Sequence, residues 1–382
     1  MFPMSLLFRS PSIAPALLSL TVICAFLPAP SFVGAVDLET VLAGQANLTT
    51  FSGLVKNHSA IFANLPDEVT IIAPNDNAFR KLGDWPSFNE STVEATLKYH
   101  ILTKYLSMTS VVKGDSIWAS TTLNDSDFST VKGGQRLILT KQPGGEVVLT
   151  SGFATRGTVV VEDLAFDKGL VQVIDSVMRV PEPLESTARN AYTDLTAFLG
   201  ALYVSGLMSE VAREEEVTIF APHNAAFQQL SGVFEGMDAE KLKRILRYHL
   251  VPGNVSHIWE LKNASSLTTA ESGQLLITRH NNYVYVNAAE IIQTDILLSN
   301  GLVHMIDNVL NPDLEAALPN LNTTAQPPAF TLMGATATGT SVPTPFTSNL
   351  PCTASCPVTS TQPTSAGTAT VSGSAASSVG GG

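Results

Sequence analysis

The chain has little cysteine. Only three of its 382 residues are cysteines: Cys24 lies in an apolar N-terminal segment, whereas Cys352 and Cys356 lie near the C-terminus. The long stretch between them contains none, so its folding cannot depend on disulfides and must rest on buried apolar surface. Cys352 and Cys356 are close enough in sequence to form one small local loop, or they link two chains.

Positive charge and long apolar runs are also scarce. Lys and Arg number 21 against 33 Asp and Glu, a net charge of −12, and no basic run is long enough to follow a phosphate backbone, which argues against nucleic acid as a partner. The apolar run Ile13–Leu27, followed by Val33-Gly34-Ala35, predicts a secretory signal peptide over residues 1–35. A membrane anchor is disfavoured because this run is shorter than the about 20 apolar residues that are needed to span a bilayer.

Motifs of catalysis and metal binding are absent. Gly-x-Ser-x-Gly, His-Glu-x-x-His and phosphate-binding glycine loops do not occur. The seven histidines are scattered, and none lies three or four residues from another, as metal ligands on a helix would. The sequence therefore predicts no catalytic residue, no metal site and no cofactor.

What the sequence does contain is a duplication. Three blocks recur in the same order: Thr70–Phe79 as Thr218–Phe227, Tyr99-His100 as Tyr248-His249, and Gly169–Met178 as Gly301–Leu310. The period is typical of one folded domain and far too long for a solenoid repeat. We expect tandem domains over residues 36–181 and 186–311, joined by a linker at about Pro181–Asn190.

The copies differ in length between their second and third blocks. His100 to Gly169 spans 69 positions, His249 to Gly301 only 52, so copy one has 17 extra residues. These fall within 113–157, a region rich in Gly, Ser, Asp and Thr, which predicts longer surface loops.

Both copies predict the same order of elements. Apolar residues at helical spacing precede the first block, namely Leu48, Phe51, Leu54 and Val55, and Leu195, Phe198, Leu199 and Leu202. Each first block reads as strand, turn and helix, and a further helix follows, announced by the capping-box spacing of Ser91–Glu94 and by Asp238. Hairpin strands and a final alternating strand complete each copy, which predicts an α+β fold of mostly antiparallel strands.

These blocks, in this order and spacing, resemble the fasciclin (FAS1) family over about residues 36–311. The leader, two such domains and a Ser/Thr-rich tail are similar to secreted or surface members from fungi. The resemblance implies two β-wedges flanked by helices, and a role in adhesion or matrix contact without catalysis.

Tyr99-His100 and Tyr248-His249 are the family's named motif, and in animal members this region is linked to receptor binding. Each histidine lies on the apolar face of its helix, beside a tyrosine whose hydroxyl needs a hydrogen-bond partner. A buried hydrogen-bond network is therefore favoured over a binding role.

Asp295-Ile296 is similar to the Asp-Ile adhesion motif of animal fasciclin domains, and Asp163-Leu164 is its counterpart in copy one. These four residues are the candidate partner-binding site. A solvated turn aspartate that bonds its own backbone explains the residue as well. Trp118 and Trp259, each in an Ile-Trp pair, favour core or edge packing, with carbohydrate stacking as the alternative.

Seven Asn-x-Ser/Thr sequons indicate a glycosylating secretory route: Asn47, Asn57, Asn89, Asn124, Asn254, Asn263 and Asn322. Residues 312–382 are rich in Ser, Thr and Pro, which predicts a disordered stalk suited to O-glycosylation. A lipid-anchor signal would need a hydrophobic tail, which the printed C-terminus does not show.

The sequence thus predicts a secreted or cell-surface glycoprotein that acts by adhesion. Its expected partner is a cell-surface or matrix protein or a glycan, with homophilic contact as a further option. A factor of the vacuolar or endolysosomal lumen that assists membrane trafficking is the alternative.

Overall fold

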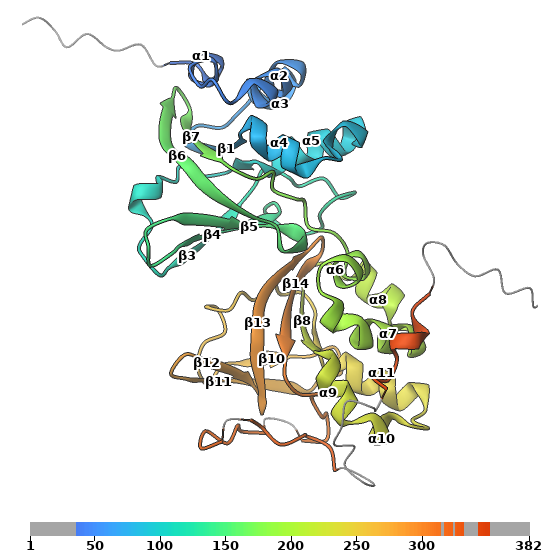
Figure 1. Cartoon of the computed structure of the whole chain (residues 1–382). Helices are drawn as coiled ribbons and strands as arrows, with labels where there is room; N and C mark the ends of the chain where they lie inside the picture. Colours follow the sequence, from blue (N-terminus) through green and yellow to red (C-terminus); the bar gives the residue numbers. More distant parts are fainter. Residues whose placement is uncertain (1–35, 315–316, 324, 332–342, 352–382) are drawn as a thin grey trace, which may run out of the picture.

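The computed structural model describes residues 36–314, 317–323, 325–331 and 343–351. It contains two domains of the same architecture, stacked one on the other (Figure 1). The predicted signal peptide, Cys352 and Cys356 lie outside the described residues.

Each domain is built on a seven-stranded mixed sheet. The first has the strand order β2-β1-β7-β6-β5-β4-β3. Its strands are β1 (Val69–Pro74), β2 (Ile101–Leu102), β3 (Ser116–Ser120), β4 (Arg136–Lys141), β5 (Val147–Thr150), β6 (Arg156–Phe166) and β7 (Gly169–Ile174). A bridge between Leu102 and Thr121 brings the two ends of this sheet together.

The second sheet repeats this topology in the order β10-β11-β12-β13-β14-β8-β9. Its strands are β8 (Val217–Pro222), β9 (Leu250–Val251), β10 (Ser266–Thr268), β11 (Gln274–His280), β12 (Tyr283–Val286), β13 (Ala289–Leu298) and β14 (Gly301–Ile306). The α+β prediction of mostly antiparallel strands is confirmed, with one parallel pair in each sheet: β1 with β7, and β8 with β14.

The parallel pair lies where the sheet is covered on both faces. All six residues of β1, and all six of β8, are buried, as is usual for parallel strands. Two apolar clusters form in each domain, one on either side of the sheet. The two copied blocks that form these strands therefore specify the centre of each core.

Helices cover one side of each sheet (Figure 1). In the first domain they are α1 (Leu38–Ala43), α2 (Thr49–Asn57), α3 (Ser59–Ala63), α4 (Asp76–Leu82) and α5 (Glu90–Tyr99). In the second they are α6 (Leu184–Asn190), α7 (Thr196–Val204), α8 (Met208–Arg213), α9 (Asn224–Gln229), α10 (Ser231–Phe234) and α11 (Ala239–Arg247). The short 3₁₀ segments are η1 (Trp85–Ser87), η2 (Met108–Ser110), η3 (Gly152–Ala154), η4 (Thr193–Leu195) and η5 (Thr347–Asn349).

The N-cap of α5 differs from the sequence prediction. The helix begins at Glu90 because the side chain of Asn89, a sequon asparagine, accepts a hydrogen bond from Thr92 N–H at 2.8 Å. Ser91 therefore lies inside the first turn. In copy two the predicted cap is confirmed, since the Asp238 side chain accepts from Lys241 N–H at 2.9 Å.

The predicted linker is mostly part of the second domain. Residues 184–190 form α6, and Leu184 and Ala188 are 3% and 0% exposed within the second domain's main core cluster. The second domain therefore starts with this helix. The average composition of the segment does not reveal its apolar face. Only a very short connection is left between the two folds.

The Tyr-His pair stabilises the C-terminal end of the helix that leads into it, α5 in the first domain and α11 in the second, here called the motif helices. In copy two, His249 Nδ1–H donates to the carbonyl of Ile245 at 2.8 Å, while Nε2 accepts from Leu310 N–H at 2.9 Å. Tyr248 O–H donates to the carbonyl of Gln274 at 2.7 Å. Both ring nitrogens are satisfied only by the neutral imidazole with its proton on Nδ1.

Copy one makes the same contacts. His100 joins the carbonyl of Thr96 at 2.7 Å to the N–H of Met178 at 3.0 Å, and Tyr99 O–H donates to the carbonyl of Arg136 at 2.8 Å. Burial lowers the pKa of both His100 and His249 to about 4. The motif therefore ties one helix to a hairpin and to the segment after the last strand.

Part of the expected stalk packs on the second domain. Phe346 contacts Phe227 and Phe234 edge to face, with ring centroids 5.9 and 5.4 Å apart, and an Arg189 side-chain N–H donates to the carbonyl of Pro351 at 2.9 Å. Residues 343–351 are thus ordered, although the sequence predicts disorder for 312–382. The reason is Phe346, an apolar side chain that the average composition of the tail does not reveal.

No helix among the described residues is both long and apolar enough to cross a membrane.

Replacing His249 by Ala should destabilise the second domain in a pH-dependent way. The folded-state pKa of about 4 lies below the unfolded value of 6.5, so the unfolded chain takes up the proton first. Stability due to neutral His249 is complete above about pH 6.5 and falls by about 3 kcal/mol on acidification to pH 4. Urea unfolding should therefore show a deficit of about 3 kcal/mol for His249→Ala at pH 7 that nearly disappears at pH 4.

The comparison between the two proteins at each pH is essential, because other groups titrate as well. Burial raises the pKa of Asp307 to about 6, so its contribution runs in the opposite direction and is lost as the pH rises through 6. An equal deficit at both pH values, or none at pH 7, would contradict the role given to His249.

Replacing Gly200 by Ala should release residues 343–351. A Cβ on Gly200 in α7 would lie 2.0 Å from the carbonyl oxygen of Phe346, whereas a Cβ on Gly53, its counterpart in α2, would meet nothing within 4 Å. Amide hydrogen exchange in 343–351 should accelerate in Gly200→Ala and stay at the wild-type rate in Gly53→Ala. Unchanged exchange in Gly200→Ala would show that the tail does not depend on this close approach.

Candidate interaction site at the domain junction

The longer loop of copy one contacts the second domain. This loop, residues 121–135 between β3 and β4, has a much shorter counterpart between β10 and β11. Gln135 Nε2–H donates to the carbonyl of Leu298, and Thr130 N–H donates to the carbonyl of Ser299, both at 3.0 Å. Both acceptors lie at the β13–β14 turn, which points toward the first domain (Figure 1). The extra residues of copy one therefore build part of the junction.

Charge and the connecting segment add further contacts. Lys132 Nζ lies 3.0 Å from Glu216 Oε2 across the junction, although such an exposed pair contributes little to stability. Ser299 N–H donates to the carbonyl of Glu182 at 3.1 Å. The sequence pointed to neither Gln135 nor Lys132, and the one signal available for this loop was its unequal length in the two copies.

An aromatic stack joins the first sheet to a loop of the second domain. The indole of Trp118 in β3 lies on the imidazole of His257, with centroids 3.6 Å apart and planes inclined by 22°. His257 is 5% exposed, and its Nδ1 has no hydrogen-bond partner and lies 3.8 Å from Asp295 Oδ1. Trp118 thus packs at an edge of its own domain, against a side chain of the other.

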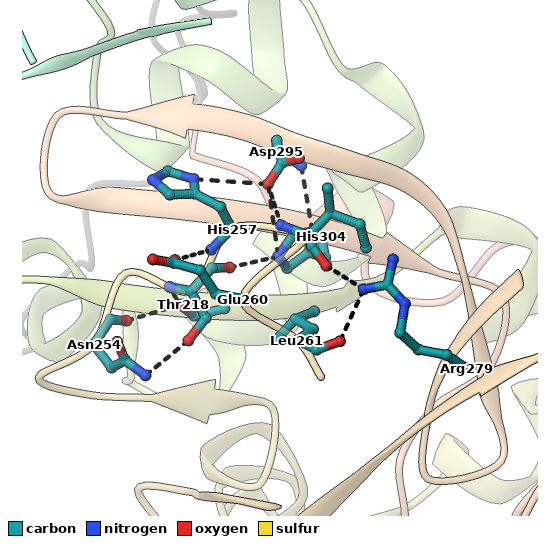
Figure 2. Close-up of polar contacts among 10 residues, drawn as sticks. Thr218, Asn254, His257, Glu260, Leu261, Arg279, Asp295 and His304 are labelled. Carbon is teal, nitrogen blue, oxygen red and sulfur yellow. Dashed lines mark hydrogen bonds and ion pairs between the residues drawn. The ribbon is translucent and has the colours of Figure 1, made fainter. Parts of the chain in front are cut away.

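The two candidate aspartates hold equivalent loops. Asp163 and Asp295 lie at bulges of β6 and β13, not in turns, with φ of 58° and 59°. Each carboxylate accepts from the loop after the motif helix: Asp163 from Met108 N–H at 3.0 Å, and Asp295 from Ile258 N–H at 3.1 Å. Figure 2 shows Asp295 between His257 and His304.

A third residue completes this network, and it differs chemically between the copies. In copy one Gln172 accepts from Asp163 N–H at 2.8 Å and donates to the carbonyl of Leu106 at 3.1 Å. In copy two His304 Nδ1 accepts from Asp295 N–H at 3.3 Å, and its Nε2–H donates to the carbonyl of Ser256 at 2.9 Å. An amide in copy one and a neutral imidazole in copy two therefore bridge the same two backbone groups.

The electrostatics agree with this structural role. Burial lowers the pKa of His304, and the charge of Asp295 opposes that lowering only in part. Burial raises the pKa of Asp163, but hydrogen bonds from Ser107, Gln172 and Met108 outweigh it and leave the pKa below its ordinary value. The imidazole is thus held neutral, and the Asp163 carboxylate is held ionised.

The copies diverge at the residue that faces this aspartate. Ser107 O–H donates to Asp163 Oδ2 at 2.6 Å, whereas its counterpart His257 makes no hydrogen bond to Asp295 and stacks on Trp118 instead. Copy two has a histidine in place of this serine, and its ring makes a contact between the domains.

For the candidate partner-binding residues, the structure gives a position. Asp295 is 8% and Ile296 2% exposed, the latter within the second core, while Asp163 and Leu164 are half-buried. Their use by a partner remains a prediction. All seven sequon asparagines are exposed, so the geometry allows a sugar on each, and occupancy also remains a prediction.

A groove opens beside the stack and is lined from both domains. Its volume is about 400 Å³, and Trp118 and Arg156 form its wall on the first domain, with Trp259, Gln293 and Asp295 on the second. The two tryptophans do not occupy equivalent positions in the two copies. Met108 and Ile258 are equivalent because each donates to the equivalent aspartate of its copy, so the next residue, Trp259, corresponds to Thr109 and not to Trp118. Each domain supplies its tryptophan from a different element.

One group could bind a metal ion. The ligand atoms of His58, Glu90 and Glu94 lie within 4.8 Å of one another, and within the described residues no other such group occurs. Imidazole and carboxylate are ligands that zinc accepts. His58 Nδ1 is also 3.4 Å from Glu90, as in an ion pair. The absence of a metal site, expected from the sequence, remains a prediction.

Replacing Gln135 by Ala should loosen the junction. The side chain is 1% exposed, and its loss leaves the carbonyl of Leu298 without its partner, which costs about 1–3 kcal/mol. Small-angle X-ray scattering should show a larger radius of gyration for Gln135→Ala than for the wild type. Gln274→Ala, whose side chain bonds Thr268 within one domain, is the control. The same radius in all three proteins would mean that Gln135 does not hold the domains together.

Comparison with known proteins covers both copies. The profile described as Fasciclin domain matches residues 46–181 and 193–312, more than half of the chain. A fasciclin-like arabinogalactan protein of Arthroderma benhamiae is 31% identical over 69% of this chain and 63% of its own length, so the chain spans slightly less than two thirds of that relative. Fasciclin-like arabinogalactan protein elcF of Phaeosphaeria nodorum is 26% identical over 74% of this chain and 91% of its own.

More distant relatives include an animal protein. Human periostin is 25% identical over 71% of this chain and 30% of its own length. A solved FAS1 domain pair from the insect cell adhesion molecule fasciclin I aligns with 69% of this chain and 97% of its own, at 18% identity and a TM-score of 0.34, which is too low to compare domain arrangements. On the profile match to both copies, the chain belongs to the fasciclin domain family.

Proposed function

We propose that this protein is a secreted or cell-surface adhesion module without enzymatic activity, and that its two domains bind as one unit. The observation that carries this proposal is the junction. Residues that the two copies do not share, namely Trp118, His257 and the 121–135 loop, join the domains and leave an open groove between them. A fixed surface made by both domains is suited to binding a partner.

The network around Asp295 argues against catalysis at this place. Of its two histidines, His304 is fully buried with both ring nitrogens engaged in holding the backbone, and His257 is 5% exposed and stacked under the Trp118 indole. A general base needs an accessible nitrogen beside the substrate. The proposal is also consistent with the relatives, which include fasciclin-like arabinogalactan proteins and periostin.

Contact through the junction also changes how the pair would bind. Two domains on a long flexible linker gain affinity by effective concentration alone. Here the connection is short and the domains contact each other, so binding energy is not spent on fixing their orientation. The pair should therefore behave as one site with two walls.

Cells that lack the protein should adhere less to one another and to a coated surface than cells that produce it. Re-expression of the full chain should restore adhesion, and an internal epitope tag should place the protein outside the cell or in its wall. Equal adhesion with and without the protein would contradict the proposal. A tag found only in the vacuolar lumen would favour the trafficking alternative instead.

A further inference from the structure

The groove at the domain junction has the surface of a sugar-binding site. We propose that it binds a neutral oligosaccharide, with one pyranose ring on Trp259 and its hydroxyl groups on polar side chains of both domains. This inference rests on the proposed adhesion function and names the chemical class of its ligand. The supporting observations are an exposed but fixed tryptophan, uncommitted polar groups and the charge of the groove.

Trp259 is exposed although its loop is rigidly held. The side chain is 41% exposed, and the residues beside it are anchored on both sides. His257 N–H donates to Glu260 Oε2 at 2.8 Å, and the Arg279 guanidinium donates to the carbonyls of Ile258 and Leu261 at 2.8 and 2.9 Å (Figure 2). A fixed aromatic face loses little conformational entropy when a ligand stacks on it.

The fold does not require an aromatic residue at this position. Thr109 is the counterpart of Trp259 in copy one, where the aspartate holds the loop in the same way. Trp118 lines the groove from the other domain and is fixed by its stack on His257. The copies thus differ in a way that packing within one domain does not explain.

The polar lining leaves hydrogen-bonding groups uncommitted. Arg156, Gln293 and Thr294 line the groove and are exposed. Within the part of the chain that the structure describes, these three side chains form no hydrogen bond or ion pair. Guanidinium, amide and hydroxyl groups together offer the donors and acceptors that sugar hydroxyls require.

Charge favours a neutral sugar over an acidic one. Arg156 is the one basic side chain in the lining, and the Asp295 carboxylate lies on the opposite wall. The chain as a whole carries a net charge of −12, which repels a polyanion at low salt. Neutral pyranoses stack through their C–H faces and need no counter-charge.

The test is a titration of the full chain with soluble neutral hexasaccharides of β-linked glucose, β-linked N-acetylglucosamine and α-linked mannose, and with an acidic hexauronate for comparison. At least one should bind and change tryptophan fluorescence, with affinity measured by calorimetry. Trp259→Ala should weaken that binding at least tenfold and keep the wild-type melting temperature. The control is Tyr283→Ala, which removes a 51% exposed aromatic ring of the same domain outside the groove and should bind like the wild type.

Three results would overturn the inference: no hexasaccharide binds, Trp259→Ala binds as well as the wild type, or only an acidic hexauronate binds. Adhesion assays with the same variants separate this inference from the proposed function. If the cells adhere but no sugar binds, the groove assignment fails and the adhesion function stands. If a sugar binds in the groove but adhesion does not depend on the protein, the adhesion function fails and the groove assignment stands.

Discussion

Both domains depend on one buried helix end. A helix leaves its last carbonyls without partners inside itself, and here the motif helix ends under the sheet, away from water. His100 and His249 solve this by accepting an N–H from the segment after the last strand while donating back to their own helix. The neighbouring tyrosines add a bond to the hairpin. The helix, the hairpin and the segment after the last strand are thereby held together.

The loop after the motif helix shows how structure and function separate. Both copies anchor it with an aspartate and with an amide or imidazole that bridges two backbone groups. At the two variable positions of this loop, copy one has Ser107 and Thr109, and Ser107 bonds an aspartate of its own domain. Copy two has His257, which stacks on Trp118 of the other domain, and Trp259, which lines the groove. The shared residues hold the loop, and the unshared residues determine what it meets.

The fold could be predicted from the sequence because the copied blocks contain the residues that determine it. These are β-branched runs such as 69–72, apolar residues at helical spacing and the Tyr-His pairs. It was less informative where contacts join segments without a pattern. Asn89 caps α5 through a side chain that is also part of a sequon. Helix α6 buries Leu184 and Ala188 in a stretch that the sequence predicts as a linker. The contacts at the junction could not be derived from the unequal loop lengths, because Gln135, Thr130 and His257 match no motif and meet their partners only when both domains are folded.

The central claim is that shared residues stabilise each domain while unshared residues join the two. Amide hydrogen exchange of the full chain, comparing the wild type with Trp118→Ala, tests it most directly. The claim predicts faster exchange at 256–260 and at the β13–β14 turn, with unchanged exchange at 245–249, which covers the end of α11 and the Tyr-His pair. Loss of protection throughout α11 would mean that the junction also stabilises the second domain, and no change at 256–260 would mean that the stack does not join the domains; either result would contradict the claim.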